Sequence, residues 1–337
     1  MTKSAMSACL LILLPAVAFS QEAPSRQRVG KASLSPEVQT AIGKGLAHLA
    51  KTQKKDGRWG DQHSVADTSL ALMAFMLQGH VPGREPYGKN MDRAVAYLVN
   101  VGKKGQKGYL GTPNNHAGMY EHGLAVLALS EAWGQSTNPD IRVTLKRAVD
   151  VTLSAQNHQG GWRYSPQPRD ADLSMTVMQI MAINSAKEAG IAVPDATLKR
   201  AVKYVLHCQD ETSGGFGYSG PTGPGFARTA AGVISLIMCG QRDHPAVRRG
   251  MIFLRAYPEQ KFNGGSHFLY AHYYAIQCMY QSGDEDFNAW YPKITKVLLE
   301  KQAEDGSWNI SQGEAYSTSL SILIMGVPYR FLPIYQR

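Results

Sequence analysis

The stretch that decides the fold runs from Lys44 to Trp59 and reads KGLAHLAKTQKKDGRW. A basic residue is followed by a glutamine nine positions later, a glycine after four more, and a tryptophan two positions beyond the glycine. This spacing occurs three times, as Lys44, Gln53, Gly57 and Trp59, as Arg147, Gln156, Gly160 and Trp162, and as Lys293, Gln302, Gly306 and Trp308. Self-similarity at such a period indicates a repeat architecture.

Three further copies are degraded but keep the register. One retains Gln209 and carries Phe216 in place of the tryptophan, with one residue inserted. The other two have lost the glutamine, and Pro258 stands at its position in one of them. The basic residues that open the six copies are 44 to 54 positions apart: Lys44, Arg93, Arg147, Arg200, Arg249 and Lys293.

Each copy predicts two helices of different character. The segment before the glutamine, such as residues 196–208, puts its apolar residues on one face, as in a helix with one wet side. The segment after the turn, such as Leu70–Leu77, is apolar all round and is expected to be buried on every side. It ends on a glycine, the usual left-handed helix cap: Gly79, Gly134, Gly190, Gly240, Gly283 or Gly326. The sequence therefore predicts an all-α fold, a closed α/α toroid (an α6/α6 barrel) of six helix-pair repeats.

The beginning of the chain has the pattern of a secretory signal. Lys3 precedes a short apolar core at Leu10–Ala18, and Ala18-Phe19-Ser20 forms a small-x-small cleavage site. We expect residues 1–20 to be a signal peptide, residues 21–35 a flexible lead-in and residues 36–337 a single toroid domain, exported to the periplasm or the cell exterior. N-terminal sequencing of the exported protein is expected to begin at or near Gln21, and a cytoplasmic protein with Met1 intact would contradict this.

The composition and charge limit the kinds of molecule that the protein is expected to bind. The chain of 337 residues is 44% hydrophobic and carries a net charge of +9. Positive charge favours contact with anionic surfaces, which makes peripheral membrane contact an expectation. No run of basic residues interleaved with aromatics occurs, and nucleic-acid binding is therefore not expected.

The repeat pattern, Lys/Arg-Gly-x-x-aromatic-Leu-x-x-x-Gln-x-x-x-Gly-x-Trp, resembles the QW repeat of the squalene–hopene cyclase family. The same toroid occurs in the β subunits of protein prenyltransferases. The resemblance covers roughly residues 36 to 337, with His48 at the aromatic position of the first copy. It implies that glutamine and tryptophan brace the end of an outer helix against the start of an inner one, where N–H groups lack partners. The residues given this structural role are Gln53, Trp59, Gln156, Trp162, Gln209, Phe216, Gln302 and Trp308.

The resemblance also suggests a proton donor. The cyclases carry an Asp-x-Asp-Asp motif, and the comparable stretch here is Asp170-Ala171-Asp172-Leu173. Two close carboxylates raise the pKa of one of them, which suits a general acid, so Asp172 and Asp170 are the candidate catalytic residues. Leu173 departs from the motif. Aspartate is also a preferred helix N-cap, and Asp67 at the equivalent place in the first repeat favours that structural alternative.

Other polar residues are expected near the mouth of the toroid. The candidates for lining the cavity are Asp67, His122, Arg228, His272 and Tyr273, with Arg228 placed to meet an anion. Tyrosines flank the same mouth and are suited either to stabilising a carbocation or to packing: Tyr164, Tyr218, Tyr270, Tyr273, Tyr274 and Tyr316. No spaced pair of ligands supports a metal among these residues, and no cofactor is predicted.

Two functional hypotheses remain. The first is an enzyme resembling the terpenoid cyclases, acting on an apolar isoprenoid-like molecule by acid-initiated cyclisation or isomerisation. Prenyl transfer is the weaker enzymatic option, because the Asp-x-Cys zinc motif of the prenyltransferases is absent from the sequence. The alternative is a non-catalytic protein that binds such a molecule or uses the toroid surface as a scaffold. An intact apolar cavity with a buried Asp172 of raised pKa favours the enzyme, and a cavity filled by side chains favours the scaffold.

Overall fold

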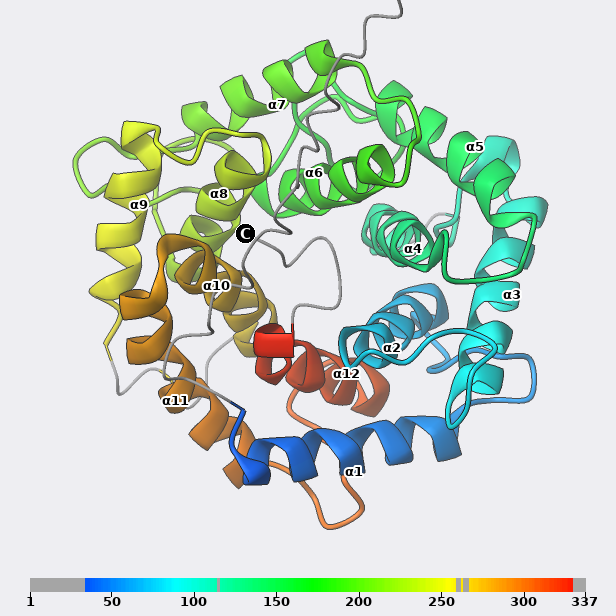
Figure 1. Cartoon of the computed structure of the whole chain (residues 1–337). Coiled ribbons are helices and arrows are strands. Elements are labelled where there is room, and N and C mark those ends of the chain that lie inside the picture. Colours follow the sequence, from blue (N-terminus) through cyan, green and yellow to red (C-terminus); the bar gives the residue numbers. More distant parts are fainter. Residues whose placement is uncertain (1–33, 114–115, 259–261, 263–266, 330–337) are drawn as a thin grey trace, which may run out of the picture.

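The computed structural model describes residues 34–113, 116–258, 262 and 267–329. These residues form an all-helical α/α toroid of twelve α-helices without a strand (Figure 1). Six helices form the inner ring: α2 (Ser64–Leu77), α4 (Gly118–Ala132), α6 (Leu173–Glu188), α8 (Phe226–Met238), α10 (Phe268–Ser282) and α12 (Glu314–Met325). Six form the outer ring: α1 (Pro36–Thr52), α3 (Gly88–Lys104), α5 (Ile141–Ser154), α7 (Asp195–His207), α9 (Pro245–Arg255) and α11 (Asp284–Glu300). The predicted fold class is confirmed. The predicted signal peptide and residues 21–33 lie outside the described residues.

Burial explains the two kinds of helix. Every residue of α2 from Val65 to Leu77 is buried, because the helix packs against neighbours on all sides. Outer helix α3 buries only one face, and its basic residues remain on the other. The ring closes where α12 packs against α2 and α1 packs against α12. No helix in the described part of the chain is long and apolar enough to cross a membrane.

The glycines that follow the inner helices mostly adopt the predicted left-handed conformation. Gly79, Gly134, Gly190 and Gly240 have φ between 74° and 86°. Gly326 does not, because its φ is −84° and the chain continues directly into a short 3-10 turn at Val327–Tyr329. Gly283 also departs from the prediction, because its φ of 138° and ψ of 176° lie outside the left-handed helical region and the chain enters α11 at once.

The repeat glutamine connects one repeat to the next. Gln209 Nε2 donates to Gly214 O in its own turn at 2.9 Å and to Ala246 O on the following outer helix at 2.8 Å. Its Oε1 accepts from Arg249, the basic residue of the next copy, at 2.8 Å. Gln302 donates in the same way to Ala41 O on α1, at 2.8 Å, and so ties the last repeat to the first. The glutamine thus stabilises the contact between repeats, in addition to the contact within one repeat that the family resemblance implies.

The tryptophan braces its own helix pair, as the resemblance implies. Trp162 Nε1 donates to Thr152 O near the end of α5 at 2.8 Å. Its backbone N–H donates to Thr176 Oγ1 in the first turn of α6 at 3.1 Å. Trp59 and Trp308 make the matching pairs of hydrogen bonds, and all three side chains are buried.

The turn glycine permits a close approach to the next repeat, which gives a testable effect on stability. Gly160 has φ +97°, and a methyl group there would overlap the backbone carbonyl oxygen of Arg200. Gly134 has a similar φ of +86°, but a methyl group there meets no atom within 4 Å. Both changes to alanine incur a left-handed strain of about 1–2 kcal/mol.

We expect Gly160→Ala to lower the free energy of unfolding by about 1–2 kcal/mol more than Gly134→Ala, because only the first also displaces an outer helix. Denaturant unfolding of both variants beside the wild type measures this difference. Equal losses would contradict the close approach between the repeats.

Candidate active site

The toroid encloses a cavity of about 870 Å³ at the N-terminal ends of its inner helices. That volume is typical of a site for a small molecule. Its deeper wall is apolar, formed by Leu70, Leu124, Met178 and Leu320. Its upper wall carries tyrosines: Tyr120, Tyr164, Tyr218, Tyr270, Tyr274 and Tyr316. Five of the six tyrosines named from the sequence therefore line the cavity, and Tyr273 does not.

Asp67 is the acid best placed to act inside this cavity. It lies in the first turn of α2, its residue is 8% exposed, and its side chain forms part of the cavity lining. Burial, the charge of Glu121 and the charge of Asp61 raise its pKa to about 7. The helix N-terminus favours the ionised form by up to about 2 kcal/mol, but burial prevails. Asp67 is therefore partly protonated at neutral pH, as a general acid requires.

Glu121 affects the site although it is not among the cavity-lining or catalytic candidates taken from the sequence. It is fully buried in the first turn of α4, although glutamate is rarely buried without partners. Its Oε2 accepts from the backbone N–H of Thr112 at 2.6 Å, and its Oε1 lies 3.2 Å from His63 Nδ1. The sequence could have pointed to Glu121, because it is an acidic residue at the start of an otherwise apolar inner helix. Its charge helps to keep Asp67 protonated.

Asp172 and Asp170 are not brought together as a catalytic pair. Asp172 is the N-cap of α6: its Oδ1 accepts from Met175 N at 2.8 Å, and its residue is fully buried. Asp170 is exposed and pairs with Arg163 at 3.1 Å. Burial raises the pKa of Asp172 to about 6, while the hydrogen bond from Met175 and the charge of Arg163, 3.6 Å away, lower it. Asp170 was expected to raise the pKa of Asp172, but it is not among the groups that shift it. Arg163 contacts both carboxylates and lowers this pKa instead.

His122 and His272 were expected at the mouth of the cavity, but neither lines it. His122 is fully buried in α4, where Leu110 N donates to its Nδ1 at 3.0 Å and its Nε2 lies 3.0 Å from Thr152 Oγ1. It takes the place of the threonine that anchors the turn in the intact repeats, and burial lowers its pKa to about 4. His272 lies at the edge of an adjoining pocket of about 370 Å³ and is surrounded by aromatic rings.

Arg228 and Tyr273 are also displaced from the central cavity. Arg228 lines the adjoining pocket, together with Tyr218 and Tyr270, which belong to both spaces. Tyr273 is buried against Tyr274, with ring centroids 5.1 Å apart. A third space, of about 1180 Å³, lies beyond Tyr164 and is lined by Arg163 and Asp170.

The raised pKa of Asp67 predicts a pH-dependent contribution to stability. Its folded pKa of about 7 exceeds the usual 3.8, so the folded chain holds this proton more tightly than the unfolded chain. The contribution is fully present below pH 4 and is lost as the pH rises towards 7. The stability of the wild type relative to Asp67→Asn should therefore fall by about 1–3 kcal/mol over this interval. Denaturant unfolding of both proteins across the interval measures the difference, and a constant difference would contradict the burial of this acid.

Comparisons with known proteins agree on the fold. No family model and no curated protein matches the sequence. The type II terpene cyclase MstE from Scytonema is similar in structure, with a TM-score of 0.58 and 16% identity over 87% of this chain and 99% of that one. A variant of that cyclase in complex with its substrate, geranylgeranyl dihydroxybenzoate, has a TM-score of 0.61 at 15% identity, covering 88% of this chain and 98% of that one. An α-1,6-mannanase of glycoside hydrolase family 76 from Salegentibacter has a TM-score of 0.67 at 8% identity, over 86% and 98% of the two chains. At these identities the comparisons establish the α/α toroid fold alone.

Proposed function

We propose that this protein binds an isoprenoid-like molecule in its central cavity and isomerises or cyclises it by acid catalysis. The observation that carries the proposal is Asp67, a buried carboxyl with a pKa of about 7 in the wall of an open cavity with an apolar base. A scaffold protein has no need of such a cavity. The similarity to a cyclase whose substrate carries a geranylgeranyl chain supports the same class of ligand.

The chemistry follows from the arrangement of the lining. The Asp67 carboxyl would donate its proton to a terminal alkene of the bound chain, which forms a C–H bond and leaves a tertiary carbocation and a carboxylate. Electron pairs of further double bonds close the rings. A proton is then lost from carbon to water at the open mouth and Asp67 takes one back from water, so the product has the mass of the substrate. Tyrosine faces such as those of Tyr120 and Tyr270 stabilise the cationic intermediates, and the apolar base excludes water.

The glycosidase alternative has less support. The related mannanase is described as inactive when two aspartates consecutive in its sequence are replaced, whereas this chain has no two consecutive aspartates. The cavity wall, as far as the described residues form it, contains no tryptophan for stacking on a sugar. Trp59, Trp162 and Trp308 are all buried in the repeat turns.

The test is incubation of the purified protein with geranylgeraniol, geranylgeranyl dihydroxybenzoate and squalene, followed by mass spectrometry of the extracted products. We expect a product of unchanged mass from at least one substrate, with fewer double bonds where rings have closed. Saturable binding without turnover would instead support the non-catalytic binding protein. If the protein showed no binding and no turnover, this class of ligand would be excluded.

Export and peripheral membrane contact are part of the proposal, because an isoprenoid chain partitions into membranes. Recovery of the protein in the periplasmic fraction and its sedimentation with anionic vesicles test them.

A further inference from the structure

His48 departs from the repeat pattern at the junction between the first and last repeats. Tyr97 and Tyr204 occupy the equivalent position of two other outer helices, and Tyr97 contacts Ser64, the first residue of the preceding inner helix, at 2.8 Å. His48 reaches in the same way from α1 to Glu314, the first residue of α12. A polar imidazole, 9% exposed, therefore replaces an aromatic ring where the toroid closes.

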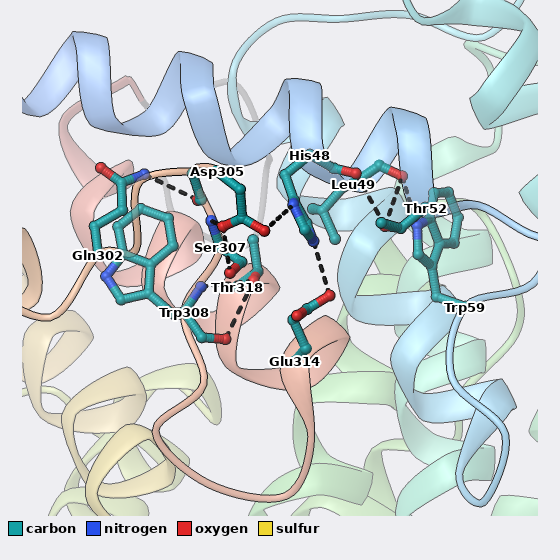
Figure 2. Close-up of polar contacts among 11 residues, drawn as sticks. His48, Leu49, Thr52, Trp59, Gln302, Asp305, Ser307, Trp308, Glu314 and Thr318 are labelled. Carbon is teal, nitrogen blue, oxygen red and sulfur yellow. Dashed lines mark hydrogen bonds and ion pairs between the residues drawn. The ribbon is translucent and has the colours of Figure 1, made fainter.

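Two carboxylates converge on this single imidazole (Figure 2). His48 Nε2 lies 2.8 Å from Glu314 Oε1, and His48 Nδ1 lies 3.3 Å from Asp305 Oδ2. One ligand atom from each of the three residues lies within 4.8 Å of the others. A neutral imidazole has one N–H, so it can donate to only one carboxylate while its other nitrogen turns a lone pair towards the second. A cation is needed between that nitrogen and that carboxylate, and it can be a proton or a metal ion.

The surroundings leave negative charge uncompensated at this position. In the described part of the chain neither Asp305 nor Glu314 has an ion pair with lysine or arginine. The two carboxylate residues retain side-chain exposures of 59% and 47%. A bound metal ion would keep access to water for its remaining ligands, and the carboxylates lose little hydration on binding it.

The carboxylate of Asp305 is already oriented by its neighbours. Its Oδ1 accepts from the backbone N–H of Ser307 at 3.0 Å and from Ser307 Oγ at 2.7 Å, which leaves Oδ2 directed at His48. Outer hydrogen bonds of this kind fix the ligands in metal sites. Glu314 is presented at the start of α12 and also lines the central cavity. The cluster thus joins outer helix α1 to the cavity wall.

We propose that His48, Asp305 and Glu314 form a binding site for a divalent transition-metal ion, with Zn²⁺ as its representative, that ties the first repeat to the last. The ion would bind one ring nitrogen and the carboxylate beside it, while the other ring N–H donates to the second carboxylate and orients the imidazole. Mixed nitrogen and oxygen ligands suit Zn²⁺ and its neighbours in the first transition series, whereas Mg²⁺ and Ca²⁺ prefer oxygen ligands alone. This inference stands apart from the proposed isomerisation, because it requires neither the cavity ligand nor Asp67.

The experiment uses the purified, tag-free protein after treatment with EDTA and dialysis. Calorimetric titration with ZnCl₂ is expected to show one ion per chain with micromolar or tighter affinity, and zinc should raise the melting temperature where an equal concentration of Mg²⁺ does not. Absence of zinc binding would overturn the proposal and leave the cluster as a contact of His48 with the two carboxylates.

Three variants locate the site. His48→Tyr introduces the tyrosine that stands at the equivalent position of two other outer helices, and Glu314→Gln removes one charge from a half-exposed side chain. Both variants are therefore expected to fold and to bind zinc at least tenfold more weakly. His158→Gln changes an exposed histidine in another repeat turn and should bind zinc as the wild type does. Unchanged affinity in both His48→Tyr and Glu314→Gln would show that the ion binds elsewhere.

Discussion

Replacement of Asp67 by asparagine is expected to reduce turnover of an isoprenoid substrate by about 10³-fold or more, within the range that a positioned general acid contributes. Asparagine has nearly the same shape but cannot donate the proton. Asp67 lies inside α2, whose N-cap is His63, so the substitution should leave the helix intact. Circular dichroism and the melting temperature of the variant provide the check on folding.

The tight packing around Asp67 means that the substitution by asparagine tests the loss of the proton donor alone. Gly60, with φ +64°, packs directly over the carboxylate, and a methyl group on it would overlap Asp67 Oδ2. Asparagine fits within this contact, whereas a longer side chain such as glutamate does not. Binding of the substrate should therefore be nearly unchanged, and the loss should appear in kcat rather than in KM.

Asp172→Asn is the matched control. Asparagine caps a helix about as well as aspartate, so α6 should be retained, and we expect turnover to remain close to that of the wild type. The opposite pattern, with activity lost in Asp172→Asn and kept in Asp67→Asn, would return the donor to the residue that the sequence motif predicts.

The position of these two aspartates explains why the sequence predicted the fold better than the site. Asp67 and Asp172 look equivalent in the sequence because each follows a repeat turn, but their registers differ. Asp67 directly precedes Thr68, which anchors its turn, whereas Asp172 lies four residues before the matching Thr176. Asp67 is therefore inside its helix and Asp172 just before its helix. Helix ends are the least certain feature of a sequence pattern, and a shift of a few residues exchanges a cavity acid for a helix cap.

The toroid itself was predictable because its repeated contacts span short intervals. Gln156 and Gly160 interact over four residues, and Trp162 and Thr152 over ten, so a fixed spacing records them. The cluster around His48 lacks such a record. Glu314 lies 266 residues further along the chain and meets His48 only because the ring closes. The sequence placed His48 at the aromatic position of the repeat, and its contacts with the two carboxylates required the three-dimensional arrangement.

Trp162→Ala is expected to lower the free energy of unfolding by about 3–5 kcal/mol, the usual cost of truncating a large aromatic side chain in a core. The side chain is fully buried between α5 and α6. Its loss leaves a cavity at the turn, and the carbonyl of Thr152 loses the indole N–H as a hydrogen-bond partner. Because neighbouring repeats share contacts through Gln156 and Arg200, the damage should extend beyond one helix pair.

Denaturant unfolding of Trp162→Ala beside Ile252→Ala measures this effect. Ile252 is 62% exposed on outer helix α9, so its truncation should change the free energy of unfolding by no more than about 0.5 kcal/mol. Trp162→Phe provides a graded comparison, because Phe216 fills the same position in the fourth repeat, where it is fully buried. It should retain most of the packing and lose mainly the hydrogen bond to Thr152. A Trp162→Ala protein as stable as Ile252→Ala would show that the repeat turn does not depend on its tryptophan.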